Sequence, residues 1–337
     1  MENKEGTVAN LPCEFHYLDP AEWEHLQRLY REKFLSNESK WIFRAEKRYK
    51  KPEHEKKLKE WKEQNQDPKR LSECPCYQVE NSYFKTSLEK AFDNFKPHEK
   101  DENGKYYTRK DLEIALLREF QRKAYQHLKY YPEPHNKIEW LTMMQHYGGP
   151  TRLLDWTYSF YAALFFALTK LDCEKEYAEV WAVDAGWIGK KGDNLCREGS
   201  GLRRLLECRR EDGINMDDLH NAILDEVFEA PTNFVFNLNS FRLNDRLIAQ
   251  QGTFLVQGNI NNDVSFDDNL KGMDVSQKEI HRIAIDITWD QRNDILKELH
   301  KMNINGAALF PGLQGFAESL ASQLAYPEKF GIERKQA

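Results

Sequence analysis

The 337-residue chain lacks the short motifs that identify the commonest enzyme classes. It contains no Walker phosphate loop, no GxGxxG and no HExxH, which argues against P-loop kinase, dinucleotide-fold and zinc-protease chemistry. A nucleophile elbow of the form GxSxG is also missing, so serine-hydrolase chemistry is not indicated. If the chain is an enzyme, its site has to be found from less common patterns.

The chain also lacks long hydrophobic runs and a secretion signal. No stretch approaches the roughly 20 apolar residues that a transmembrane helix needs. Residues 1–6 do not show the basic-then-apolar pattern of a signal peptide, and six cysteines in a chain of this length do not suggest a disulfide framework. We therefore expect a cytoplasmic protein with no membrane partner.

Basic charge is not in excess, because the formal net charge is −6. A general affinity for nucleic acid is not implied, although a local basic groove could still bind a nucleic-acid or protein target. Cys74 and Cys76 form the only closely spaced cysteine pair, and one-residue spacing is tight for a zinc chelate. We expect two thiols in a surface loop and no metal site.

Hydrophobic periodicity predicts an α+β fold with a mainly helical N-terminal part around a β-rich core. Amphipathic helices are expected from Thr108 and over 136–147, and a helix that is apolar all round over 162–168. A short strand is expected to end at Arg44, before a charged helical insertion at about 46–70. Further strands are expected at 180–183, 253–256, 281–287 and 307–310, all within a single domain over 1–337.

One stretch concentrates unusual chemistry, and it runs Gln-His-Tyr-Gly-Gly-Pro-Thr-Arg-Leu-Leu-Asp-Trp-Thr over residues 145–157. Gly148 and Gly149 permit positive φ and close backbone approach, and the proline after them forbids helix. Arg152 and Asp155 then fall in a short apolar run that is typical of a buried strand. Charges near a core are costly unless they are paired, so they indicate either a structural ion pair or a site.

This stretch, hereafter the signature, resembles the FRG domain, a family named for a Phe-Arg-Gly motif. The family pattern Gln-His-x-Gly-x-Pro-Thr-Arg-Leu-Leu-Asp-Trp-Thr is matched throughout. The naming motif is similar to residues 41–45, with Ala45 where the family has glycine. Segments 244–254 and 309–316 also resemble the family, so the resemblance spans roughly residues 40 to 325.

Arginines and amides recur around these segments, a mixture that suits a phosphorylated ligand. The guanidinium group binds phosphate through two parallel hydrogen bonds, and amides recognise polar edges such as a nicotinamide or a base. We predict ligand-binding roles for Arg44, Arg152, Gln145, Thr151 and Arg246, and catalytic roles for Gln251, His146 and Asp155.

Structural alternatives stand beside these roles. Arg152 and Asp155 could form a buried ion pair that holds the strand to a helix. His146, in the last turn of its helix, could be a satisfied helix-end residue, and the helix dipole is expected to raise its affinity for a proton.

The order of these residues also resembles ADP-ribosyltransferase folds. Those folds have a β-rich core, an arginine or histidine ending an early strand, a polar middle strand and a late Glu or Gln facing the nicotinamide ribose. Here Arg44, Thr151 and Thr157, and Gln251 follow in that order, with glutamine where glutamate is usual. The resemblance implies NAD as a substrate rather than a cofactor, and such an activity would fit a bacterial toxin or phage-defence effector.

Three functions therefore remain open. The first is an enzyme that cleaves or transfers at the glycosidic bond of NAD or a related nucleotide. The second is a nuclease or phosphodiesterase that uses His146 and Asp155, with or without a divalent metal. The third is a non-catalytic module that binds a nucleotide and reports it to a partner, which the charged stretch 46–70 motivates.

Overall fold

Seven strands form one mixed sheet in the order β1-β7-β4-β2-β3-β6-β5. The structure is a computed structural model that describes residues 11–18, 23–35, 39–50, 53–65, 74–77, 83–96, 106–191, 221, 224–225, 233–238, 244–261 and 264–325. The strands are β1 (Glu14–Leu18), β2 (Trp41–Tyr49), β3 (Leu153–Thr157), β4 (Glu176–Asp184), β5 (Val235–Leu238), β6 (Gly252–Gln257) and β7 (Ile280–Ile285). β1 and β7 are parallel, and all other neighbours are antiparallel.

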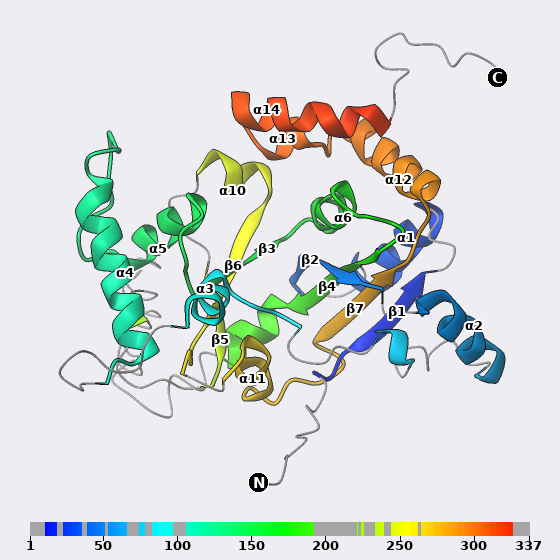
Figure 1. The fold of residues 1–337 in the computed structure, drawn as a ribbon, viewed down its shortest axis with the longest axis horizontal. Coiled ribbons are helices and arrows are strands. Elements are labelled where there is room, and N and C mark those ends of the chain that lie inside the picture. The colour runs from blue at the N-terminus through cyan, green and yellow to red at the C-terminus, as the bar shows by residue number, and fades with distance from the viewer. Residues whose placement is uncertain are drawn as a thin grey trace.

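The sheet divides between β2 and β3. β2 pairs with β4 along its whole length, and β3 pairs with β6 likewise. β2 and β3, in contrast, share a single residue pair, Phe43 with Thr157. Beyond that pair the two strands part, as the divergent ribbons in Figure 1 show. We call the place where they part the fork.

Helices cover both faces of the sheet. The covering helices include α1 (Trp23–Tyr30), α3 (Ser87–Phe95), α4 (Arg109–Ala124), α5 (Lys137–His146), α6 (Phe160–Thr169), α11 (Phe266–Lys271), α12 (Trp289–Lys301) and α13 (Gly306–Leu309). In Figure 1, α4 and α5 stand at one end of the molecule, and α12, α13 and α14 (Leu313–Ser319) form an arc along another side. Among the described residues, no helix is both long enough and apolar enough to cross a membrane.

Two hydrophobic cores result from the alternation of side chains along the strands. On β2, Ile42 packs into a core with residues of α4, α5 and α11. Trp41 and Phe43 point the other way, into a core with residues of α1, α6, α12 and α13. α6 is buried nearly all round, which confirms the expectation from its continuous apolar sequence.

Several sequence expectations need correction. β2 does not end at Arg44 but continues to Tyr49, so the charged stretch begins as a paired strand and becomes helical only in α2 (His54–Gln64). Residues 306–309 form the helix α13 instead of a strand. The N-terminal part is not mainly helical in the expected sense, because β1 and β2 both contribute to the sheet.

The cysteine pair is also placed differently from the expectation. Cys74 and Cys76 are almost wholly buried, beside Tyr77 and Leu58. Cys74 precedes the short 3₁₀-helix η3 (Pro75–Tyr77), Cys76 lies within it, and both are free thiols. Burial raises the pKa of Cys76 to about 12, so this thiol stays protonated and unreactive at neutral pH. The two residues belong to the packing of α2 on the sheet.

Candidate functional site

The signature turns the chain from the end of α5 into β3. Gly148 lies just beyond α5 with φ +80, a conformation that glycine adopts without strain. Gly149 donates to the carbonyl of Met144, and a Cβ at Gly149 would lie 2.6 Å from the Met144 side chain. Glycine is therefore required at the two positions for different reasons, which are the positive φ at Gly148 and the close packing at Gly149.

Gln145 holds the acidic group of the signature. Its amide nitrogen donates to Asp155 Oδ2 at 2.9 Å, and its Oε1 accepts from the Thr151 hydroxyl at 2.5 Å. The backbone N–H of Leu153 donates to that hydroxyl, so the hydroxyl hydrogen is available to Gln145. Ser87, the first residue of α3, also donates to Gln145 Oε1, at 3.3 Å. With its oxygen occupied in this way, the amide can present only N–H to Asp155.

Asp155 is the exposed residue of an otherwise buried strand. Its neighbours along β3 are buried, and cross-strand pairing with Phe254 fixes its backbone. A carboxylate that is both exposed and oriented by an amide is suited to contact a ligand or a developing positive charge.

Arg44 reaches the signature from β2. Its Nη1 donates to the backbone carbonyl of Asp155 at 2.7 Å, and its Nε donates to Glu46 at 2.7 Å. The guanidinium therefore bridges β2 and β3 at the fork. The side chain retains 15% exposure, and no described residue accepts a hydrogen bond from its Nη2. Arg44 thus contacts the signature, while its role as a ligand-binding residue stays a prediction.

Arg152 does not join this group. It is 1% exposed, and its Nε donates to Glu113 of α4 at 2.7 Å while its Nη2 bonds the second oxygen of the same carboxylate. Nη1 donates to the carbonyls of Gln257 and Gly258. The alternative that pairs Arg152 with Asp155 is therefore wrong, because the acid is Glu113. Arg152 fastens the start of β3 to α4 and to the end of β6.

The segment after β3 meets the short helix α10 (Asp245–Ala249). The hydroxyl of Thr157 donates to the carbonyl of Gln250 at 2.6 Å, and Tyr158 N–H donates to the carbonyl of Gln251. The Gln250 side chain is turned to the carbonyl of Leu309. Gln251 differs, since it is exposed and holds a left-handed backbone with φ 48. Gln251 adjoins Gly252, which pairs with Thr157, so its backbone lies about 10 Å along the strand from the Asp155 pair.

His146 and Arg246 lie near each other at the end of α5. Burial lowers the pKa of His146, and the positive charge of Arg246 lowers it further. The expectation that the helix dipole raises its proton affinity is wrong, because these two effects are larger. Arg246 is exposed and stacks over the ring of Phe310 at 4.9 Å. At neutral pH His146 is a neutral ring, which can accept a proton.

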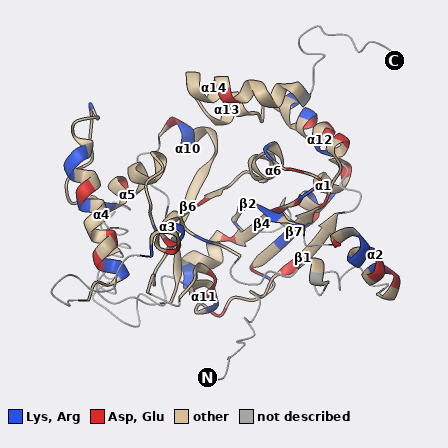
Figure 2. Ribbon diagram, viewed as in Figure 1, with Lys and Arg blue, Asp and Glu red and all other residues tan. Residues whose placement is uncertain are grey.

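A second charged cluster, which no sequence motif marks, lies farther along β2. Glu179 of β4 is fully buried between Arg48 and Arg282, and both donate to its carboxylate. Burial alone would raise the pKa of Glu179, but the two arginines outweigh it and lower the pKa. Glu46 and Arg48 follow Arg44 at every second position on β2, which is the alternation of a strand. Residues 46–70 are expected from their composition to form a charged helical insertion, so this alternation is not recognised from the sequence alone. Charge is otherwise distributed over most elements, as Figure 2 shows.

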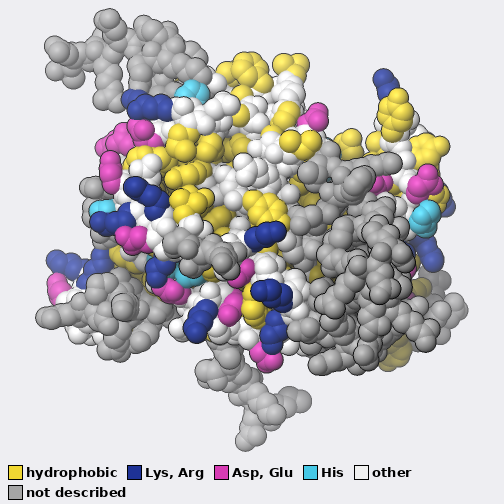
Figure 3. Space-filling model, turned by 180° about the vertical axis from the view of Figure 1, so that it is seen from behind, with side chains coloured by type: hydrophobic (Ala, Val, Ile, Leu, Met, Phe, Trp, Pro, Cys, Tyr) yellow, Lys and Arg dark blue, Asp and Glu magenta, His cyan; other side chains and the backbone are white. Residues whose placement is uncertain are grey.

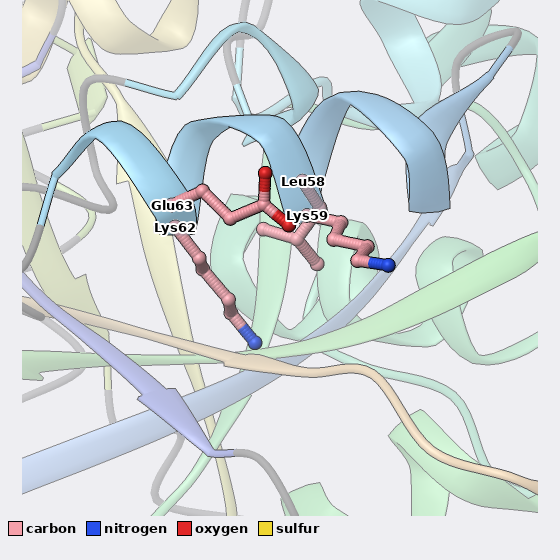
Figure 4. A pocket seen from close by; sticks show the side chains of 4 residues that line it. All are labelled: Leu58, Lys59, Lys62 and Glu63. Carbon is pink, nitrogen blue, oxygen red and sulfur yellow. The ribbon is translucent and has the colours of Figure 1, made fainter.

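An open groove of about 380 Å³ lies elsewhere, on α2. Leu58, Lys59, Lys62 and Glu63 line it (Figure 4). α2 packs against β1, β4 and β7, not against the signature. The groove is therefore not part of the site at the fork.

The metal-dependent nuclease alternative finds no support in the arrangement of His146 and Asp155. Among the described residues, the one group of three or more potential metal ligands that lie together is Glu14, His16 and His281. The Asp155 carboxylate is instead held by the Gln145 amide.

The sequence-predicted residues thus divide into three sets. Arg44, Gln145, Thr151 and Asp155 form one connected network at the fork. Gln251, His146 and Arg246 lie on the adjoining end of α5 and α10. Arg152 belongs to the scaffold. Sequence reasoning missed Ser87 and Glu46, because each acts through a partner distant along the chain or hidden by strand alternation.

Comparison with known proteins assigns a family. The FRG domain family matches residues 21–176, which include α1, β2, α3 to α6 and the whole signature. A search of curated proteins and a search of solved structures each found no match. The resemblance of segments 244–254 and 309–316 lies outside the matched range and stays a prediction. The chain therefore contains an FRG domain, matched over residues 21–176, which is just under half of its length.

Proposed function

We propose that the protein binds NAD or a related nucleotide at the fork and cleaves or transfers at its glycosidic bond. The observation that carries this proposal is the Arg44 guanidinium, which reaches from β2 to the Asp155 carbonyl where the two strands part. This contact places the Arg44 guanidinium, a group that can bind phosphate, on the residue whose exposed carboxylate is oriented by Gln145. A sheet that divides at an arginine-bearing strand also suits the resemblance to ADP-ribosyltransferases.

Arg44 would hold the pyrophosphate. Two of its nitrogens are anchored by Glu46 and Asp155, which fixes the plane of the guanidinium. Nη2, which donates to no described residue, supplies charge-assisted hydrogen bonds to phosphate oxygens. A planar group fixed in advance loses little entropy when the ligand binds.

Asp155 and His146 would serve the bond that breaks. When nicotinamide leaves NAD, the C1′–N bond electrons go to the leaving ring and positive charge develops on the ribose. The Asp155 carboxylate, oriented by Gln145, would stabilise that charge. His146, neutral because its pKa is lowered, would accept the proton of the attacking water or acceptor hydroxyl.

Gln251 would orient the ribose hydroxyls. Its left-handed backbone is unusual for a residue with a side chain, and such conformations gather at functional sites. The same conformation also ends α10, so the backbone alone has a structural reason. Glycine would serve that purpose better, and the presence of glutamine supports a role for its amide.

The test is incubation of the purified protein with NAD and measurement of nicotinamide release, together with label transfer to added protein or nucleic acid. We expect turnover that is lost in Arg44→Ala and Asp155→Asn. Arg122→Ala serves as the control, because Arg122 is an exposed arginine of α4 paired with Glu119. The proposal is contradicted if nicotinamide release and label transfer are both absent under every condition.

A non-catalytic nucleotide-sensing module would give a different result. NAD would raise the melting temperature and be recovered unchanged. Recovery of nicotinamide, in contrast, supports the enzyme. A toxin or phage-defence role would depend on that activity and is tested by growth arrest on expression of the native chain against the Arg44→Ala variant.

A further inference from the structure

The edge of the sheet farthest from the fork on the β1 side carries a cluster of three potential metal ligands. Glu14 is the first residue of β1 and pairs with His281 of β7 in the parallel register. His16 lies two residues along β1 and therefore on the same face as Glu14. The three side chains come from segments 265 residues apart, so they form no metal motif in the sequence.

The distances between the ligand atoms are close to those of a tetrahedral site. His16 Nε2 lies 3.0 Å from His281 Nδ1 and 3.8 Å from Glu14 Oε1, and His281 Nδ1 lies 3.6 Å from Glu14 Oε2. A tetrahedral zinc ion with bonds of about 2.1 Å holds its ligand atoms about 3.4 Å apart. The two glutamate distances run to different oxygens, and with one oxygen per carboxylate all three ligand atoms lie within 4.8 Å of one another. A small rotation of the Glu14 carboxylate and shifts of a few tenths of an ångström in the rings would bring one oxygen and both nitrogens to the tetrahedral spacing.

The surroundings fix the histidines and leave one side open. His281 packs edge-on against Trp41 and Phe34, and its side chain is 6% exposed. His16 is stacked on His281 and is 12% exposed. Glu14 retains 41% exposure, which provides a path for an ion and room for a water as fourth ligand.

One basic side chain, Lys33, lies next to this cluster. The Lys33 ammonium donates to Glu14 Oε1 at 2.7 Å and occupies the position beside the carboxylate that an ion would take. Its side chain is 38% exposed and can move into solvent.

We propose that Glu14, His16 and His281 form a site for one divalent transition-metal ion, zinc foremost, which fastens β1 to β7. Two imidazoles and one carboxylate match the ligand preferences of zinc. β1 lies three strand spacings from β2, or about 14 Å, so the site is separate from the fork. The proposal does not depend on the proposed function.

The experiment titrates the chelator-treated full-length protein with Zn²⁺ alone in a calorimeter and with Co²⁺ by visible absorption. We expect one ion per chain, a tetrahedral cobalt spectrum and a melting temperature that rises with Zn²⁺ concentration. Glu14→Gln and His16→Asn should each weaken binding about tenfold or more. Lys33→Met should tighten binding, because the competing ammonium is removed.

His127→Ala is the matched control, since His127 is an exposed histidine beyond the end of α4 and should leave binding unchanged. Glu14→Gln replaces a half-exposed side chain and should fold even if the histidine variants do not. Absence of saturable binding overturns the proposal. So does binding that persists at native affinity in Glu14→Gln and in every histidine variant that folds, because the ion would then lie elsewhere.

Discussion

Arginines 44 and 152 allow a direct separation of site from scaffold. Arg44 on β2 contacts the signature, and Arg152 belongs to it and directly precedes β3, but their environments differ. Arg152 is 1% exposed and bonded to Glu113, which is 2% exposed, whereas Arg44 retains 15% exposure and pairs with a partly exposed Glu46. The same substitution to alanine should therefore have opposite consequences for stability and for ligand binding.

The magnitude for Arg152→Ala follows from what it leaves behind. An unpaired buried Glu113 carboxylate costs about 3–5 kcal/mol. The carbonyls of Gln257 and Gly258 also lose their donor, at about 1 kcal/mol or more each. Against a typical unfolding free energy of about 5–15 kcal/mol, this loss should leave the protein insoluble or marginally folded.

Arg44→Ala should behave differently. The pair with Glu46 lies between the exposed and the fully buried case, and the Asp155 carbonyl loses one donor, so the variant should lose about 1–2 kcal/mol and still fold. It should, however, lose NAD binding and turnover. Thermal denaturation followed by a ligand-binding assay on both variants measures the contrast. For a 337-residue chain, the loss of about 5–7 kcal/mol for Arg152→Ala corresponds to a fall in Tm of about 7–10 °C in the fraction that folds.

The double variant Glu113→Leu with Arg152→Met provides the control. Removing both charges should cost less than the sum of the single changes, because no carboxylate is left unpaired. An Arg152→Ala variant that melts within about 1 °C of the native protein would refute the assignment of Arg152 to the scaffold. An Arg44→Ala variant that binds and turns over ligand normally would refute the role of the fork.

Three further predictions concern the turns and the histidine around the site. Gln251→Gly should keep stability or raise it by about 1 kcal/mol, because glycine relieves the left-handed conformation, but it should abolish turnover. Lys96→Gly, at a similar backbone position ending α3, should change stability in the same way and leave turnover intact. Urea midpoints measure the stability of both variants, and nicotinamide release measures their turnover. Gly148→Ala should cost about 1 kcal/mol through its positive φ alone, since a Cβ there meets nothing within 4 Å. Gly189→Ala, in the helical stretch 185–191 and also with open space, should be neutral or stabilising by up to about 1 kcal/mol, and equal urea midpoints for the two variants would contradict this reading. His146 has a folded-state pKa below its unfolded value of about 6.5, so its contribution to stability is complete above pH 6.5 and is lost as pH falls from there. NMR titration should show the lowered pKa of His146, and Arg246→Ala should raise that pKa. A titration midpoint above about 6.5 would contradict this reading and favour the helix dipole as the larger effect.

The surface beyond the site carries further exposed hydrophobic side chains. Leu313 and Leu324 are 82% and 75% exposed, near the C-terminal end of the described residues. Figure 3 shows hydrophobic side chains interspersed with charged ones on the face opposite to that of Figure 1. Single exposed hydrophobic residues are common on soluble proteins, so these carry no argument about function.

Local patterns determined much of the framework. The apolar run of α6, the amphipathic α4 with its Thr108 cap, and the strands β4, β6 and β7 were predictable because each depends on residues close together in sequence. The turn after α5 was predictable for the same reason, since its glycines are required by local backbone geometry. Errors arose where tertiary pairing overrides local composition. The charged second half of β2 is a strand because β4 pairs with it, and 306–309 is a helix despite its strand-like sequence.

By itself, the sequence determined the family, the helical and strand segments with strong periodicity, and the identity of the polar groups in the signature. Only the tertiary structure decided which of these groups act together. It joined Arg44 to Asp155 across 111 residues, gave Arg152 a partner 39 residues earlier, and brought Glu14 beside His281. The physical reason is that charge pairing and hydrogen bonding depend on distances of about 3 Å in space, and strand order, which local sequence does not encode, sets those distances.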